Sequence, residues 1–421
     1  MNAFQYVNGR LQAEDVPLEA IADEFDTPTF IYSRSAIVEA YRNFENAFTG
    51  KDHLICYAVK ANSNLGVLGL LASLGAGFDI VSGGELHRVL DAGGDPAKVV
   101  FSGVGKQNWE INAALKANIA CFNLESASEL RVLNRLAANL NTSARISVRV
   151  NPNVDPKTHP YIATGLKESK FGVSAGEAMV IYLEANKLPN IEVIGIDFHI
   201  GSQIVELSPF SDALMRILEL VDELEKTDIR LSHIDVGGGI GITYKDEQPV
   251  DVAEYAACIL QILGNRSHRL LCEPGRHIVG NAGILLTRIT TIKQNEGKKF
   301  AIVDAAMNDL IRPALYQSWQ DIKCVVTSNQ SAPNAAKYDV VGPVCESSDF
   351  LGRDRELEIN EGDLLAIFSA GAYGFTMSSN YNSRNRAAEV IVSGGTVHCV
   401  RKRETIADQV RLETTLPDNL H

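Results

Sequence analysis

The feature that most constrains the fold of this chain is the regular alternation of short apolar runs with helical patterns through its middle. Segments between the runs are amphipathic or capped: "SPFSDALMRILELVDELEKT" is one example, and Ser126 stands three residues before Glu129, a capping-box spacing. The apolar runs are Leu54–Val59, Phe78–Val81, Val99–Ser102, Ile119–Asn123, Ile146–Val150, Ile194–His199, Ile234–Val236 and Leu270–Cys272. Eight strands in this order over roughly 230 residues predict a (β/α)8 barrel of the TIM type. The alternative is an open, doubly wound sheet.

After about residue 280 the pattern changes. "AGILLTRITTIKQNEGKKFAIVDAAM" reads as strand, polar turn and strand, and later segments such as "RAAEVIVSGG" continue in this style with few helix signals. The sequence therefore predicts an α/β protein with a barrel over residues 30–280 and a β domain, a sandwich or small barrel, over residues 281–421. Residues 1–29 look like strand and turn material with a short helix near Pro17–Glu24, and we expect them to join the β domain.

Charge and cysteine content exclude several classes of partner. The 421 residues carry a formal net charge of −13 with no long basic run, which argues against nucleic acid or an anionic membrane as a partner. No stretch resembles a signal peptide or a membrane span. Seven scattered cysteines, without a Cys-x-x-Cys pair or zinc-like Cys/His spacing, predict reduced thiols in a cytoplasm and no metal site.

Polar and reactive side chains follow the ends of the predicted barrel strands. Lys60 ends the first strand in "YAVKANSN", and His199 ends the sixth in "IDFHIGSQ". The seventh runs into "DVGGGIG" and the eighth into "CEPGRHIVG", which contains Glu273 and Arg276. Because the carboxyl ends of all strands of a parallel barrel lie on one face, these groups are expected to converge there, where such barrels build active sites.

Each of these residues also has an ordinary structural explanation. A lysine at a strand end can extend to water, a lone histidine can belong to the core, and a glutamate near an arginine can form a surface ion pair. The glycines of "DVGGGIG" can form a simple turn, and they do not make a dinucleotide fingerprint, because Ile242 stands where the third glycine would be. Their exposed backbone N–H groups still suit a phosphate.

Taken together, the barrel end offers a lysine that can form an imine, a phosphate cradle and a half-buried carboxylate. Pyridoxal phosphate requires these three features: a lysine for covalent attachment, a phosphate site and an acidic partner that keeps the ring nitrogen protonated. The sequence therefore predicts pyridoxal 5'-phosphate as cofactor.

The motifs "YAVKANSN", "HIGSQ", "DVGGGIG", "EPGRHIV", "GPVCESSDF" and "AGAYGFTMSSNYNSR" occur in this order over nearly the whole chain. In this combination the chain resembles the diaminopimelate decarboxylases, a family of the alanine-racemase-like (fold type III) pyridoxal phosphate decarboxylases. The most specific motif is "GPVCESSDF", since related ornithine and arginine decarboxylases usually have Cys-Asp where this chain has Cys345-Glu346. The core motifs show no departure from the family pattern.

The resemblance implies the residues that hold the cofactor. Lys60 would bond the cofactor and later assist proton transfers, Glu273 would contact the ring nitrogen, and His199 would stack on the ring. The phosphate and its surroundings would be bound by Ser202, Gly238, Gly275, Arg276 and Tyr373.

The resemblance also implies a substrate site shared between two subunits. Cys345 would protonate the carbanion left after CO2 departs, and Glu346 would bind the distal ammonium of the substrate. The carboxylate that is not lost would be held by Arg276, Arg312 and Tyr316, with Tyr373 also lining the substrate site. The segment with Cys345 and Glu346 would enter the neighbouring subunit's site, so a homodimer is expected.

The expected activity is decarboxylation of meso-2,6-diaminopimelate to L-lysine and CO2, the last step of lysine biosynthesis. An ornithine- or arginine-type decarboxylase or an amino-acid racemase of the same fold is an alternative, as is a non-catalytic pyridoxal phosphate carrier. A nicotinamide dehydrogenase is disfavoured by the glycine spacing. Glu346 and Arg312 favour a substrate with both charges at its far end, whereas the predicted β domain with Cys345 disfavours a carrier.

Overall fold

The computed structural model describes residues 3–155, 169–327 and 335–417. They form two compact units, one made of residues 37–280 and the other of residues 1–36 with 281–421. Helix α2 (Arg34–Ala47) leads from one unit to the other. We describe each unit separately.

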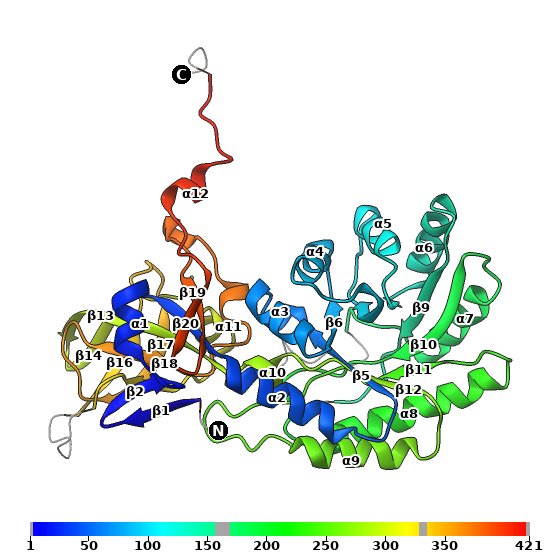
Figure 1. Ribbon diagram of the computed structural model, residues 1–421, viewed down its shortest axis with the longest axis horizontal. Coiled ribbons are helices and arrows are strands. Elements are labelled where there is room, and N and C mark those ends of the chain that lie inside the picture. The colour runs from blue at the N-terminus through cyan, green and yellow to red at the C-terminus, as the bar shows by residue number, and fades with distance from the viewer. Residues whose placement is uncertain (1–2, 156–168, 328–334, 418–421) are drawn as a thin grey trace. The chain divides into compact units, whose positions relative to one another are not determined.

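The unit of residues 37–280 is a closed, all-parallel barrel whose strands are joined through helices, so the predicted fold class is confirmed (Figure 1). Its strands pair in the order β10-β11-β12-β5-β6-β7-β8-β9, and every neighbouring pair is parallel. The strands are β5 (His53–Ala58), β6 (Gly77–Ile80), β7 (Val99–Phe101), β8 (Cys121–Leu124), β9 (Ala144–Arg149), β10 (Ile191–Asp197), β11 (His233–Asp235) and β12 (Arg269–Cys272).

Helices with one apolar side cover the barrel strands, as burial of that side requires. They are α3 (Leu65–Ser73), α4 (Gly83–Asp91), α5 (Asn108–Ala117), α6 (Ala127–Asn139), α7 (Ala175–Ala185), α8 (Ser208–Glu225), α9 (Val252–Leu263) and the short α10 (Arg276–Val279). Ser126 caps α6 by accepting the Glu129 N–H at 3.2 Å, as its spacing predicted. Leu54, Cys56, Val100, Cys121 and Leu271 pack together as one buried apolar cluster of the barrel.

Two strand ends differ from the sequence prediction. The first barrel strand stops at Ala58, and Lys60 lies in a 3-10 turn, η1 (Val59–Ala61), rather than at the strand's last position. The sixth barrel strand stops at Asp197, so His199 lies two residues beyond it. The apolar pattern continues past both strand ends because these turns are themselves packed: Val59 and Phe198 are at most 1% exposed.

The second unit contains a small hairpin sheet and a larger mixed sheet. In the larger sheet the order is β17-β16-β14-β13-β4-β19-β20, with β18 pairing with β13 and β15. Its strands are β4 (Thr29–Ser33), β13 (Gly283–Asn295), β14 (Lys298–Val303), β15 (Ile322–Cys324), β16 (Ala336–Val341), β17 (Phe350–Leu357), β18 (Leu364–Ile367), β19 (Ala388–Ser393) and β20 (Thr396–Arg401). The small sheet is β1 (Phe4–Val7), β2 (Arg10–Ala13) and β3 (Val16–Pro17), and the helices are α1 (Leu18–Phe25), α11 (Arg312–Tyr316) and α12 (Ile406–Val410).

The N-terminal residues are an internal part of this second unit. β4 lies between β13 and β19, antiparallel to the first and parallel to the second, and all five of its residues are buried. A shared apolar core joins Phe4, Leu11 and Ile21 to Ile284 and Val390.

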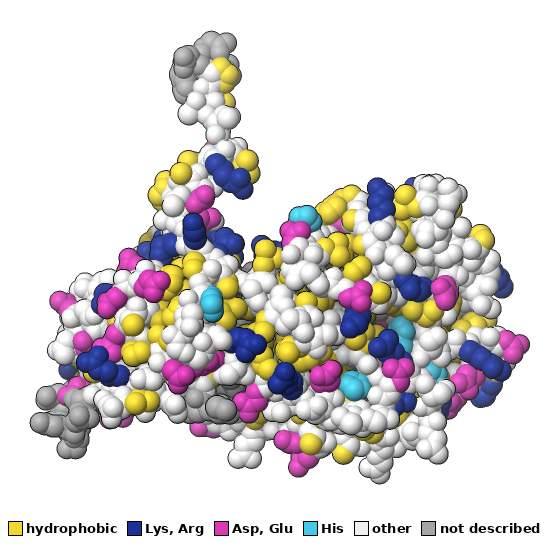
Figure 2. All heavy atoms as spheres, in the orientation of Figure 1, with side chains coloured by type: hydrophobic (Ala, Val, Ile, Leu, Met, Phe, Trp, Pro, Cys, Tyr) yellow, Lys and Arg dark blue, Asp and Glu magenta, His cyan; other side chains and the backbone are white. Residues whose placement is uncertain are grey.

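Charge is dispersed over the surface. On the face shown in Figure 2, acidic and basic side chains are interspersed, as the acidic composition without basic runs predicts. Among the described residues, no helix combines the length and apolar character needed to cross a bilayer. All seven cysteines are free thiols.

Candidate active site

The barrel unit brings Lys60 to a buried carboxylate. The Lys60 amine donates to Oδ2 of Asp79 at 2.5 Å, and the carboxylate of Asp79 is fully buried while the lysine side chain is 38% exposed. Asp79 lies in β6, the neighbour of β5, and lysine is presented by the turn that follows β5. The pairing orients the amine, and the lysine side chain stays partly exposed.

Glu273 lies directly after β12, inside the barrel, and is 6% exposed. Ser102 Oγ donates to its Oε1 at 3.4 Å. Burial, followed by the negative charges of Asp235, Asp79 and Asp197, raises the pKa of Glu273 well above its ordinary value, against the opposite effect of Lys60. A carboxylate in these surroundings gains strongly from a cationic partner.

His199 is positioned as a neutral imidazole. Burial, and then the positive charges of Arg149 and Lys60, lower its pKa well below the ordinary value. Its Nδ1 accepts the backbone N–H of Gly238 at 3.2 Å, which fixes the ring against the glycine loop after β11. A neutral ring held in this way can stack on a flat, electron-poor group.

The glycine loops leave no room for side chains. A Cβ on Gly238 would come within 2.1 Å of the carbonyl oxygen of Glu273, and one on Gly275 within 3.0 Å of the Cβ atoms of Ala58 and Ala61. Gly237 and Gly239 have φ angles of +64° and +114°, which glycine adopts without strain. The N–H groups of Gly237 and Gly238 donate to Asp235 Oδ1 and His199 Nδ1, so a phosphate bound at these loops stays a prediction.

Arg276 is 4% exposed and binds within its own unit. One of its terminal nitrogens donates to the hydroxyl of Tyr244 and the other to Oγ of Ser202 at 3.1 Å. Its guanidinium lies 5.7 Å from the centre of the Tyr244 ring. Ser202 and Arg276, both expected at the site, are thus brought together, and Tyr244 is a partner that the sequence analysis did not identify.

Three further barrel residues were missed by sequence reasoning. Arg149, at the end of β9, donates to Glu125 at 3.1 Å and lies 3.9 Å from Asp197. Glu85 of α4 accepts the N–H of Val81, and burial raises its pKa to about 7 although Lys60 acts in the opposite direction. Asp79 is described above. Asp79 and Arg149 share one signal that was available in the sequence: each is a charged residue within an otherwise apolar run.

The second unit holds the other predicted residues, in two groups. Arg312 begins α11, is 6% exposed and stacks over Tyr316 with 5.4 Å between guanidinium and ring centre. Cys345 and Glu346 are exposed; Asn382 donates to the Cys345 sulfur at 3.1 Å, and the Tyr381 hydroxyl donates to Glu346. Asn382 and Tyr381 were not identified from the sequence as site residues.

Tyr373 has a strained backbone. Its φ of +56° is rare for a bulky side chain. The following residue is Gly374, where a Cβ would come within 2.4 Å of the Ala370 carbonyl oxygen. Strain of this kind persists where the surrounding structure holds a side chain in a required direction, and it is often found at functional sites.

A parallel barrel with a lysine, a buried glutamate and glycine turns after its strands fits the class of pyridoxal-phosphate-dependent enzymes. Residues 34–280 match the model of the pyridoxal-binding domain of pyridoxal-dependent decarboxylases. The chain is 56% identical to the diaminopimelate decarboxylase of Pseudomonas aeruginosa and 54% identical to that of Vibrio cholerae, over 99% of this chain and 100% of each relative.

Solved structures agree with these sequence matches. The diaminopimelate decarboxylase of Helicobacter pylori, complexed with L-lysine, superposes with a TM-score of 0.91 at 45% identity, covering 94% of this chain and 99% of the other. That of M. jannaschii, also in complex with L-lysine, gives a TM-score of 0.94 at 38% identity, over 100% and 99%. The chain belongs to the diaminopimelate decarboxylase family of pyridoxal-dependent decarboxylases. It is therefore an enzyme that uses pyridoxal phosphate.

Proposed function

We propose that this enzyme decarboxylates meso-2,6-diaminopimelate to L-lysine and CO2, the last step of lysine biosynthesis. The observation that carries the proposal is full-length identity of 56% to a diaminopimelate decarboxylase, together with the Cys345-Glu346 pair of this chain. Structures of relatives in complex with L-lysine, the product of this reaction, support it.

The barrel residues fit the cofactor on grounds of their own chemistry. A cation at the ring nitrogen would supply the buried Glu273 with the partner that its surroundings favour. The neutral ring of His199 can lie on the cofactor ring, and the side-chain-free loops at Gly238 and Gly275 can receive the phosphate. When bound, pyridoxal phosphate supplies an electron-poor ring that accepts the electron pair left by the departing CO2.

We assign the remaining cofactor contacts to residues whose positions are already fixed. Lys60 provides the amine that bonds the cofactor, and Asp79 holds that amine in place. Ser202 and Arg276 brace each other beside the glycine loops, and they contribute hydrogen-bond donors to the phosphate surroundings. Tyr373, whose φ of +56° is rare for a bulky residue, is proposed as a further contact of the phosphate surroundings.

Substrate recognition requires groups for one ammonium and one carboxylate at the far end of diaminopimelate. Glu346 supplies a negative charge for the ammonium, and its hydrogen bond from Tyr381 orients it. Arg312 and Arg276 supply positive charge for the carboxylate, with Tyr316 stacked under Arg312, and Tyr373 lines the same site. An arginine–carboxylate pair is directional and strong, so the distal carboxylate selects the substrate.

Cys345 is proposed as the proton donor that follows loss of CO2. Its thiol is exposed, and the Asn382 amide at 3.1 Å fixes the position of the sulfur. A thiol can serve as general acid because its ordinary pKa lies within a few units of neutrality.

We further propose a homodimer in which Cys345 and Glu346 act in the partner's site. The exposure of both side chains is consistent with a role on a surface that a second subunit covers. The seven free thiols favour a reducing compartment, and we place the enzyme in the cytoplasm.

The test is CO2 release from a panel of diaminopimelate, ornithine, arginine and lysine, with bound pyridoxal phosphate verified by absorbance. We expect kcat/KM to be highest for diaminopimelate and L-lysine to be released as product. Efficient decarboxylation of ornithine or arginine with diaminopimelate inert would replace this proposal by a diamine-forming activity of the same fold.

A further inference from the structure

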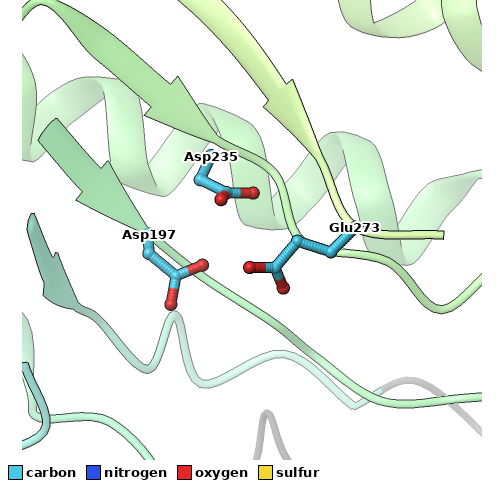
Figure 3. A group of neighbouring side chains, drawn as sticks. All are labelled: Asp197, Asp235 and Glu273. Atoms are coloured by element: carbon cyan, nitrogen blue, oxygen red, sulfur yellow. The ribbon is translucent and has the colours of Figure 1, made fainter. Parts of the chain in front are cut away.

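The barrel unit contains a cluster of three buried carboxyl groups at the ends of neighbouring strands. Asp197, Asp235 and Glu273 each place a carboxyl oxygen within 4.8 Å of the others, and Figure 3 shows the three side chains pointing toward one another. Burial, followed by the charge of Asp79, raises the pKa of Asp235 to about 7. Because Glu273 is proposed for the cofactor, this cluster belongs to the site already described.

A separate cavity lies within the second unit. Its volume is about 620 Å³, which is in the range of sites for small organic molecules. Its wall includes Ser318 and Trp319, which follow α11, and Phe350, Arg353 and Arg355 of β17. None of the residues proposed above for the cofactor or the substrate lines this cavity. It therefore needs an explanation of its own.

The charge in the cavity wall is positive. Arg353 is exposed, and its guanidinium lies 3.8 Å from the centre of the Phe350 ring. Arg355 is 6% exposed, and its guanidinium lies 3.1 Å from the centre of the Trp319 ring. Among the residues that the structure describes, no acidic side chain lines the cavity, and no carboxylate comes within 4.0 Å of either guanidinium. Two cations thus face one cavity without an anion.

Arg355 is a buried cation with unused donors. Its Nη2 donates to the backbone carbonyl of Gln320 at 2.8 Å, whereas its Nε and Nη1 have no acceptor in the described part of the chain. The hydroxyl of Ser318, in the same wall, is likewise buried and without a partner among these residues. Burial lowers the pKa of Arg355 to about 10, against the opposite effect of Asp321. Buried polar atoms require partners, and a buried cation gains strongly from an anion.

We propose that this cavity binds a small organic anion, whose carboxylate or phosphate group is held by Arg353 and Arg355 and whose apolar part packs against the aromatic wall. A guanidinium matches the oxygens of either group with two parallel hydrogen bonds. Stacking on a ring uses the flat face of a guanidinium and leaves its in-plane N–H groups for the ligand. The exposed Arg353 supplies such groups directly, and burial of Arg355 strengthens the attraction of its charge for the anion.

The fluorescence of Trp319 in the cofactor-loaded enzyme tests the binding. The chain has two tryptophans, and Trp109, in the barrel unit, is 56% exposed, so Trp109→Phe leaves Trp319 as the single reporter. Benzoate, phenyl phosphate and neutral benzamide are titrated at constant ionic strength. We expect a saturable change with a Kd of about 1 mM or lower for at least one of the two anions, and none for benzamide. The preferred anion identifies the group as carboxylate or phosphate. An equal response to benzamide, or no saturable response to either anion, would overturn the proposal.

Two substitutions locate the bound anion. Arg353→Met removes an exposed guanidinium and keeps a long side chain, so the fold should persist while affinity falls about tenfold or more, the usual effect of losing a charge-assisted hydrogen bond. Arg355→Lys keeps the buried charge but lacks the planar fork, and it should also weaken binding. Arg411→Met, at an exposed position of the same unit, is the matched control and should bind as the unsubstituted protein does. Unchanged affinity in either cavity variant, or an equal loss in the control, would contradict the assignment. The titrations use no amino-acid substrate, so failure of the proposed function leaves their result intact.

Discussion

The candidate site residues of the two units differ in how they are held. In the barrel unit, Lys60, Glu273 and Arg276 are buried or half-buried, and each is hydrogen-bonded to a side chain from another strand or loop of the barrel. In the second unit, Cys345 and Glu346 are exposed, and each is held by one side chain of the 381–382 turn. The barrel residues are thus fixed by contacts within one unit. The side chains of Cys345 and Glu346 are exposed, so a second subunit can contact them.

The two units therefore contribute different properties to the enzyme. Burial among carboxylates sets the protonation of the barrel groups before any ligand arrives, as the raised pKa values of Glu273 and Asp235 indicate. Preorganised electrostatics of this kind are the main means by which proteins stabilise developing charge. Most residues proposed for the cofactor lie in the barrel unit, with Tyr373 as the exception, and most residues proposed for the substrate lie in the second unit, with Arg276 as the exception.

The largest effect is expected at Lys60. Lys60→Ala should abolish covalent attachment of pyridoxal phosphate, because only an amine can form the bond, and kcat should fall by more than about 10³-fold. Borohydride reduction followed by peptide mapping checks the attachment, with Lys116→Ala as a control at an exposed position. A pyridoxyl label on any other lysine would disprove the assignment.

Glu273→Gln should keep the fold and the cofactor while turnover falls by about 10²- to 10³-fold, the range for loss of one preorganised electrostatic group. The amide is close in size to the acid but cannot stabilise a protonated ring nitrogen. The measurement is kcat at saturating cofactor, with occupancy verified by absorbance. Turnover close to that of the unsubstituted enzyme would rule out the role of Glu273.

Arg312→Leu should change which substrate the enzyme prefers and should leave cofactor binding unaltered. It should cost about 2–5 kcal/mol of transition-state binding for diaminopimelate, the range for breaking a buried charge pair. Discrimination against ornithine and lysine should narrow, because they lack the distal carboxylate. Values of kcat/KM for the four amino acids check this. An unchanged ratio between diaminopimelate and ornithine would remove Arg312 from the substrate site.

Mixing two inactive variants tests whether the exposed residues act in the partner subunit. If they do, Lys60→Ala and Cys345→Ala proteins, after subunit exchange, should form hybrid dimers with one intact site. Random exchange should then restore about a quarter of the activity, since half of the dimers are hybrids with one site each. No recovery, once exchange has been verified by mass spectrometry, would show that Lys60 and Cys345 act in the same chain.

The last effect concerns stability rather than activity. The pKa of Asp235 is raised to about 7 in the folded protein. Between its ordinary pKa and this raised pKa, Asp235 is therefore protonated in the folded protein and ionised in the unfolded chain. Its contribution to stability is therefore lost as the pH rises through this range. Asp235→Asn does not titrate, so its stability relative to the unsubstituted cofactor-free protein should rise from pH 4 to pH 7, by at most about 4 kcal/mol. Denaturant titrations at each pH check this, and a parallel pH dependence in both proteins would contradict it.

The sequence predicted the barrel from its eight apolar runs, and each run contains an observed strand or most of one. It predicted less about the ends of those strands. Periodicity records which residues are buried but does not distinguish a strand from a tightly packed turn, so Lys60 was expected within the first strand and lies in the η1 turn.

The partners of the predicted residues depend on pairing between distant segments. Asp79 is 19 residues from Lys60, and Ser102 is 171 residues from Glu273. Which strand neighbours which, and in which register, decides that these side chains meet. A charged residue inside an apolar run, such as Asp79 or Arg149, was the available signal. Exposed residues such as Asn382 carried no comparable signal, because exposed polar residues are common.

The position of β4 has a consequence for synthesis of the chain. This strand is made within the first 33 residues, yet its partners β13 and β19 begin at Gly283 and Ala388. During translation, all eight barrel strands are synthesised before either partner of β4 exists. The barrel can therefore fold while β4 waits with both edges unpaired, and an edge of this kind is prone to wrong pairing. Chains that stop before Ala388 leave β4 with one open edge, which makes them targets for chaperones and proteases.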